Sequence, residues 1–176
     1  RAIQGEFGKS LITRRPVTYE LMEGIPATVY LAVVGIGLSM LIAIPLGTLA
    51  AVRRNTQTDY AAQVSSLAGI SIPEFWFAIM CVLVFSLYLG WLPSSGYISP
   101  FVDFKQSLIF LILPAIAVGF RQAAFTTRLT RSSMLDEMNK EYVDTGRSLG
   151  FSENKVIYKY PLRNAMIPTI TISGLQ

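Results

Sequence analysis

Long apolar segments alternate with short polar segments along this chain of 176 residues. Only Glu74 and Arg121 place a charge inside the apolar segments. A helix that crosses a bilayer needs about 20 predominantly apolar residues, and each of the first three segments is at least that long. The pattern therefore predicts membrane spans at residues 26–52, 60–89 and 107–127, and the start of another at 164–176.

Basic residues near the ends of these segments predict their orientation, because they gather on the cytoplasmic side of a membrane. Arg53, Arg54 and the stretch 128–163 carry nine basic residues, whereas the loop 90–106 carries only Lys105. The polar segments between the spans therefore fall on opposite sides of the membrane. We expect 53–59 and 128–163 to be a cytoplasmic turn and a cytoplasmic loop, and 1–25 and 90–106 to be extracytoplasmic.

Proline and glycine positions predict where the helices bend. Pro26 lies near the start of the first span, where proline is tolerated. Pro45 lies deeper, where it is expected to kink the helix. Gly69 and Pro73 predict a break in the second span, so we expect the segment 60–89 to be kinked near Pro73.

Small residues recur at every fourth position in three of the apolar segments. Such stripes let helix backbones approach closely in lipid, where burial of apolar surface contributes little. We interpret them as packing surfaces within the chain, and packing against a second subunit is the alternative. The stripes are Ala43, Gly47 and Ala51; Ala61, Ser65 and Gly69; and Ala115, Gly119 and Ala123.

The polar stretch 128–163 stands out because it holds seven of the fifteen basic residues and five of the eleven acidic ones. It also carries signals of ordered structure. Gly150 can adopt the left-handed conformation that ends a helix, Ser152 can cap a second helix, and Pro161 marks a boundary. We interpret this helix–glycine–helix unit as a docking surface. The apolar stripe of its first amphipathic helix consists of Leu135, Met138, Tyr142, Thr145 and Leu149.

Composition agrees with a membrane protein, since 52% of the residues are apolar, 15% are charged and the mean hydropathy is +0.46. The chain has no histidine and a single cysteine, Cys81. This excludes an internal disulfide and Ser–His catalysis and argues against a His/Cys metal site. The net charge of +4 comes from basic residues beside apolar segments, so lipid headgroups explain it better than nucleic acid. We expect no catalytic residue.

The tripeptide Gly8-Lys9-Ser10 resembles the end of a phosphate-binding loop. That loop requires another glycine five residues before the Gly-Lys pair, and Ile3 occupies this position. No alternation of strands and helices follows. We expect a polar loop here, and no ATP bound by this chain.

Glu74 and Arg121 are candidate functional residues. A charge inside a membrane is costly unless it faces a cavity or a partner, so both are candidates for lining a translocation path. In the alternative interpretation, Glu74 lies at a helix break near the membrane interface and Arg121 extends its head group to that interface.

The segment from Tyr142 to Pro168, YVDTGRSLGFSENKVIYKYPLRNAMIP, resembles the EAA loop of permeases of binding-protein-dependent ABC importers. The nearest resemblance is to the dipeptide, oligopeptide and nickel branch. It extends to RLTRSSML (128–135), GISIPEFW (69–76) and GWLP (90–93), and so covers nearly the whole chain. Departures from the general motif occur where its name-giving residues and its terminal proline would stand. The departing residues are Asp144, Thr145, Gly146 and Arg163.

The resemblance implies an all-α polytopic membrane protein with the helical bundle of a type I importer permease (MetI-like), present here as an internal fragment truncated at both ends. It implies a multi-pass inner-membrane subunit that translocates peptides, or solutes such as nickel chelates, by alternating access. The implied partners are an ABC ATPase that binds ATP and Mg²⁺, a second, homologous but different permease chain, and an extracytoplasmic substrate-binding protein. The loop residues implied in coupling to the ATPase are Tyr142, Asp144, Thr145, Gly146, Arg147, Gly150, Phe151 and Ser152.

Two other functions remain compatible with the residue pattern alone. An ion-coupled secondary transporter also has broken helices and a carboxylate within the membrane, as Glu74 would provide. Such a transporter needs no ordered EAA-like loop. A membrane scaffold protein without transport activity is the second alternative, against which the charged residues and proline-broken spans argue.

Overall fold

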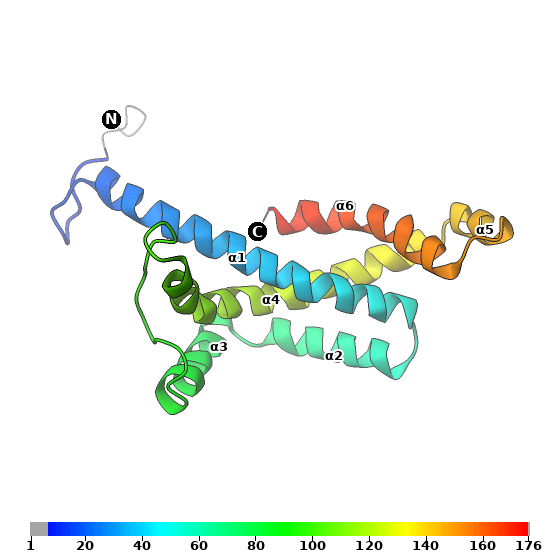
Figure 1. Cartoon of the computed structure of the whole chain (residues 1–176), viewed down its shortest axis with the longest axis horizontal. Coiled ribbons are helices and arrows are strands. Elements are labelled where there is room, and N and C mark those ends of the chain that lie inside the picture. The colour runs from blue at the N-terminus through cyan, green and yellow to red at the C-terminus, as the bar shows by residue number, and fades with distance from the viewer. Residues whose placement is uncertain (1–6, 176) are drawn as a thin grey trace.

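The computed structural model describes residues 7–175, so residues 1–6 and 176 of the expected end segments lie outside it. Helices joined by turns and loops make up most of the described chain (Figure 1). Two of the helical segments, η2 and η3, have the wider turns of a π-helix. In chain order the elements are α1 (Val17–Val52), α2 (Gln57–Ser71), α3 (Glu74–Cys81), η2 (Val82–Tyr88), α4 (Phe104–Met138), α5 (Glu141–Ser148), η3 (Lys155–Lys159) and α6 (Pro161–Ser173).

The longest helices, α1 and α4, lie side by side and run in the same direction, while α2 and α6 run the opposite way along α4 (Figure 1). Close backbone approach explains the α1–α4 contact. A Cβ atom built on Gly47 would lie 2.7 Å from the carbonyl oxygen of Thr127, and one on Gly119 would lie 3.0 Å from the carbonyl oxygen of Gly35. The first and third small-residue stripes therefore pack within the chain, as predicted.

The second small-residue stripe behaves differently. Gly69 of α2 is buried, and a Cβ there would lie 2.8 Å from the methyl group of Ala124 in α4. Ala61 and Ser65 of the same stripe are exposed. Packing within the described chain therefore accounts for only one member of this stripe.

The break expected in the segment 60–89 is present, because α2 and the following helical segment Glu74–Tyr88 meet at 96°. Ile72 has an extended backbone and Pro73 precedes α3, in keeping with the exclusion of helical geometry before proline. Gly69 is not part of this break. It lies inside α2, where its small size serves packing.

Helix ends differ from the predicted segment limits. Helix α1 begins at Val17, so Pro26 lies inside it rather than at its first turn, and the helix continues through Pro45. Helix α4 continues past residue 127 to Met138. Charged residues alone do not end a helix, since Arg128–Met138 contains neither glycine nor proline.

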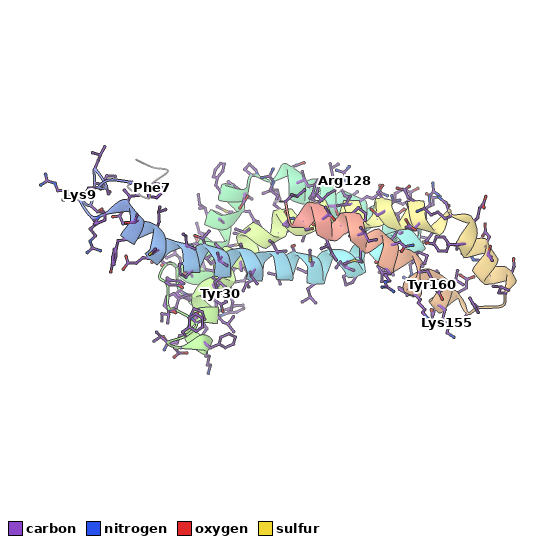
Figure 2. All side chains as sticks on the ribbon, turned by 90° about the horizontal axis from the view of Figure 1, so that it is seen from above. Phe7, Lys9, Tyr30, Arg128, Lys155 and Tyr160 are labelled. Atoms are coloured by element: carbon purple, nitrogen blue, oxygen red, sulfur yellow. The ribbon has the colours of Figure 1, made fainter. Side chains whose placement is uncertain are left out.

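Among the described residues, α1 and α4 are each long and apolar enough to cross a membrane, and the bent pair of α2 with Glu74–Tyr88 would make a third span if counted as one. Phe7 and Lys9 lie at one end of the long axis of the molecule, and Lys155 and Tyr160 lie at the opposite end (Figure 2). The limits of the segments inside the bilayer stay a prediction.

Candidate functional site

The end of the molecule distant from the N-terminus carries α5, η3 and the start of α6 (Figure 1). We call residues 139–164 the coupling segment, after the role that the sequence resemblance implies. The expected single helix from Leu135 to Leu149 is wrong, because α4 ends at Met138 and Lys140 has an extended backbone before α5. The predicted stripe is therefore divided between two helices. Val143 is the buried residue of α5, and Leu149 is 67% exposed.

Gly150 ends α5 in the left-handed conformation, with φ of +77°, which confirms the predicted turn. The N–H of Gly150 donates to the carbonyl of Arg147 at 2.9 Å, and the N–H of Phe151 donates to the carbonyl of Gly146 at 3.1 Å. These two bonds satisfy carbonyl groups that the end of a helix leaves without partners. The chain is thus turned sharply and held there.

The helical segment that leads into η3 begins after Ser152, and Ser152 contributes to it through its backbone carbonyl. Its carbonyl oxygen accepts from the N–H groups of Lys155 at 2.9 Å and Val156 at 3.1 Å. The predicted cap through the Ser152 hydroxyl is replaced by this backbone contact. Pro161 is a boundary as predicted, and it is the first residue of α6, a position where proline is well tolerated.

An apolar pocket of about 420 Å³ lies between α5, η3 and α6. Val143 and Val156 form its buried base, whereas Phe151 and Tyr160 are each 45% exposed. Exposed apolar side chains around a small hollow suit the docking of a partner protein. The pocket is lined by Tyr142, Val143, Thr145, Gly146, Leu149, Phe151, Val156, Tyr160 and Asn164.

Arg147 bridges the two sides of the Gly150 turn. Its Nε donates to Glu153 at 3.1 Å and its Nη1 donates to Asp144 at 3.3 Å. The hydrogen bond to the Glu153 carboxylate is the main cause of a raised pKa for Arg147. These groups are well exposed, so the ion pairs orient the turn more than they stabilise it.

Glu137, at the end of α4, is a functional candidate that sequence reasoning missed. One carboxylate oxygen accepts from Lys140 at 2.6 Å, and the other accepts from the Tyr142 hydroxyl at 2.8 Å and the Asn164 amide at 3.2 Å. Burial, followed by the bond to Glu137, raises the pKa of Tyr142. A single carboxylate thus ties α4, α5 and α6 together. No local spacing signals this, because Asn164 lies 27 residues away in sequence.

The predicted loop residues come together in part. Tyr142, Thr145, Gly146 and Phe151 line the apolar pocket. The others form the turn and its outer surface, with Gly150 and Ser152 in the backbone of the turn. Asp144 is 77% exposed beside Arg147.

The two predicted intramembrane charges also meet, at a different place. The Nη1 atom of Arg121 lies 3.8 Å from the Glu74 carboxylate, and the side chains are 59% and 43% exposed. Both line a hollow of about 700 Å³ at the α2–α3 bend, together with Pro73 and Pro114. The pair is weak and open to its surroundings.

The coupling segment and most of the bundle match one family of known proteins. Residues 43–176 match the family described as "Binding-protein-dependent transport system inner membrane component". The chain is 40% identical over 177 residues to the oligopeptide transport system permease protein AppB of Bacillus subtilis, covering 99% of this chain and 56% of that protein. It is 37% identical over 175 residues to the glutathione transport system permease protein GsiC of Escherichia coli K12, covering 99% of this chain and 55% of that protein.

The chain thus spans a little over half the length of the curated relatives it matches. The relatives carry the names of oligopeptide and glutathione permeases, in agreement with the peptide branch that the motifs resemble. The all-α fold agrees as well. On this evidence the chain belongs to the family of inner membrane components of binding-protein-dependent transport systems, the type I ABC importer permeases.

Proposed function

We propose that this chain is part of the permease subunit of an ATP-driven importer that moves peptides across the inner membrane by alternating access. The observation that carries the proposal is the ordered coupling segment, with its exposed apolar pocket, at one end of the helical bundle. The names of the relatives support peptides as substrates. Nickel chelates are a second substrate class, supported by the sequence resemblance alone.

A stiff connection from the coupling segment to the long helices supports ATP-driven motion. Glu137 joins the end of α4 to α5 through Tyr142 and to α6 through Asn164. A partner that displaces α5 would therefore move α4 and α6 as well, because coupling is carried by hydrogen-bond networks and packed side chains. In this proposal ATP and Mg²⁺ bind to a separate ATPase subunit and this chain supplies the docking surface.

The other proposed partners follow from the family and the resemblance. The family description names dependence on a binding protein, which would deliver substrate on the extracytoplasmic side. A second permease chain, homologous but different, would complete the path. The protein would cross the inner membrane several times, for which the length and apolar character of α1 and α4 provide support.

Cross-linking at Phe151 tests the coupling role. We expect a Phe151→Cys variant of the full-length protein, with Cys81 replaced by alanine, to cross-link to cysteines placed in the surface groove of the cognate ATPase. The yield should change when ATP is added, because nucleotide closure moves the docking surface. Phe151 is suited to this because it is exposed and borders the pocket.

The matched control is Phe101→Cys, which is 96% exposed in the loop between η2 and α4. It should give no cross-link to the ATPase. Equal cross-linking from both positions, or none from Phe151 together with uptake that follows the proton gradient, would contradict the proposal. The second result would favour an ion-coupled secondary transporter. Correct membrane insertion without any uptake would favour a scaffold protein.

We also propose that Glu74 and Arg121 line the aqueous path. A weak, half-exposed ion pair beside a hollow is poorly suited to hydrocarbon. An Arg121→Cys variant should react with a membrane-impermeant thiol reagent, and peptide substrate should slow the reaction. Val33→Cys on α1, which is 63% exposed and expected to face lipid, is the control. Equal, slow labelling at both positions would place Arg121 in lipid.

A further inference from the structure

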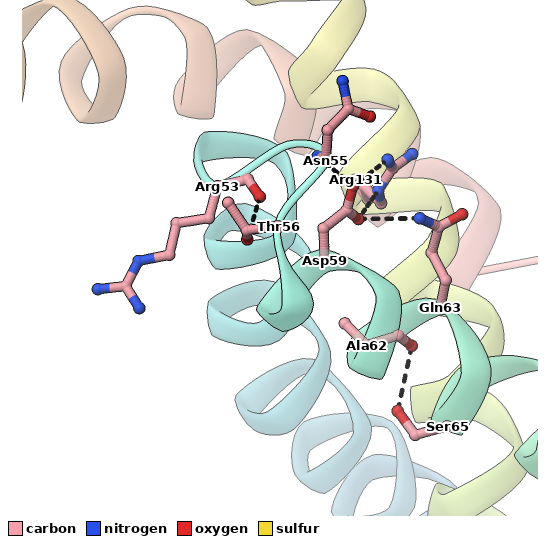
Figure 3. A network of polar contacts seen from close by, with 8 residues as sticks. All are labelled: Arg53, Asn55, Thr56, Asp59, Ala62, Gln63, Ser65 and Arg131. Carbon is pink, nitrogen blue, oxygen red and sulfur yellow. Dashed lines mark hydrogen bonds and ion pairs between the residues drawn. The ribbon is translucent and has the colours of Figure 1, made fainter.

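Asp59 and Arg131 form a buried, two-pronged ion pair between α2 and α4 (Figure 3). Arg131 Nε donates to Asp59 Oδ1 at 2.6 Å, and Arg131 Nη2 donates to Asp59 Oδ2 at 2.7 Å. The Asp59 side chain is 1% exposed and that of Arg131 is 19% exposed. The two residues lie 72 positions apart in sequence, so this pair is a purely tertiary contact.

The same carboxylate also holds the turn that joins α1 to α2. The N–H of Asn55 donates to Asp59 Oδ2 at 3.0 Å, and the Gln63 amide donates to Oδ1 at 3.0 Å (Figure 3). Asn55 has a φ of +62°, a conformation that few residues other than glycine adopt. Asp59 therefore connects the α1–α2 turn, the first turns of α2, and α4.

This arrangement resists opening. Each carboxylate oxygen has two donors, and the paired geometry of a guanidinium and a carboxylate is among the strongest hydrogen-bonded contacts in proteins. Separating the two partners would leave a nearly buried charge without compensation, which is strongly unfavourable. Close packing of Gly47 in α1 against Thr130, the neighbour of Arg131, surrounds the pair with well-packed helices.

In the proposed function, the pair lies between two regions that move during transport, the coupling segment and the bend at Pro73. Helix α4 continues from Arg131 towards Glu137 and the coupling segment. Helix α2 leads from Asp59 in the opposite direction to the 96° bend, where Glu74 faces Arg121. A displacement of the coupling segment can reach that bend through α2 only if α2 follows α4.

We propose that Asp59 and Arg131 are positioning residues that lock α2 to α4, so that movement of the coupling segment is transmitted to the bend at Pro73. This inference rests on the proposed transport function. It assigns to a residue pair outside the coupling segment a share in converting ATPase motion into opening of the path. The pair stays closed throughout the cycle, in contrast to an ion pair that breaks as a gate.

The test uses the full-length permease in its assembled complex, reconstituted in proteoliposomes, with uptake and ATP hydrolysis measured together. We expect Arg131→Gln to lower the peptide transported per ATP by about tenfold, within the usual range of coupling between distant sites, while ATP hydrolysis persists. Arg131→Lys keeps the positive charge but cannot form the two-pronged contact with Asp59, so its ratio of peptide transported per ATP should be intermediate. Arg128→Gln, which removes an exposed basic side chain one turn away on α4, should behave like the wild type.

A distance measurement separates transmission from a merely structural role. Spin labels at Tyr60 on α2 and Arg128 on α4, both exposed, should report the same distance with and without ATP in an otherwise wild-type complex. With Arg131→Gln added, the distance should change or broaden when ATP binds. A structural role alone would reduce the amount of assembled complex but leave the transport ratio of the remainder unchanged.

Two results would overturn the inference: a normal transport ratio in Arg131→Gln, or a wild-type distance that shifts when ATP binds. If Arg131→Gln does not assemble, the ratio of Arg131→Lys and the wild-type distance decide the question. Absence of ATP-dependent uptake in the wild-type complex would instead refute the proposed function. The distance between the spin labels in the wild-type complex would then still show whether α2 and α4 move together.

Discussion

We expect Gly150→Val to leave the permease inserted and folded but to reduce the substrate transported per ATP by about tenfold or more, the scale of a lost coupling between sites. Gly150 has a φ of +77°, and a Cβ atom there would meet nothing within 4 Å. The effect therefore comes from the backbone. An L-residue in this conformation costs about 1–2 kcal/mol, and β-branched residues tolerate it least. The variant should re-orient η3 relative to α5.

Two variants serve as controls for this prediction. Gly150→Asn should retain most of the coupling, because asparagine adopts the left-handed region more readily. Gly37→Val makes the same substitution at an exposed glycine of α1 without a positive φ, where a Cβ meets nothing within 4 Å, and should retain coupling. Paired measurements of ATP hydrolysis and uptake in proteoliposomes provide the readout. Wild-type coupling in Gly150→Val would refute the role of this turn.

The second large effect is expected at Gly47, where substitution should separate α1 from α4. A Cβ there would lie 2.7 Å from both the Thr127 carbonyl oxygen and the Thr130 Cβ. A backbone atom cannot move aside as a flexible side chain can, so Gly47→Leu must displace a whole helix. Overpacking usually lowers stability by about 1–3 kcal/mol. We expect the loss caused by leucine at this contact to lie at the upper end of that range.

Thermal unfolding of the detergent-solubilised protein, followed by loss of the monodisperse peak in size-exclusion chromatography, measures this effect. Gly37→Leu is the matched control, because Gly37 is an exposed residue of the same helix and a Cβ there meets nothing within 4 Å. We expect a clearly lower unfolding temperature only for Gly47→Leu. Equal unfolding temperatures for the two variants would show that the close α1–α4 approach is not required.

Local sequence signals predicted the elements that depend on neighbouring residues. The left-handed turn at Gly150, the boundary at Pro161 and the break at Pro73 are all present. Each follows from the conformational limits of one residue and its neighbours. The family was also recognisable from motifs, because the segment from Tyr142 to Pro168 carries them contiguously.

Helix ends were less predictable. The charge pattern placed limits at residues 26 and 127, but α1 begins at Val17 and α4 ends at Met138. Charge records the change from apolar to polar surroundings, whereas a helix ends where the backbone is turned or its carbonyls find other partners. The prediction of a single helix from Leu135 to Leu149 was wrong because the backbone turns between Met138 and Glu141, which the apolar spacing does not signal.

By itself, the sequence determined the all-α class, the family, the turn at Gly150 and the boundary at Pro161, because these depend on apolar length, on glycine and proline, and on contiguous motifs. The tertiary structure alone decided which faces meet. Asp59 with Arg131, Glu137 with Asn164, and Glu74 with Arg121 are pairs joined across long stretches of chain. A side chain finds such a partner only after whole helices have packed, so no spacing within one helix encodes the pairing.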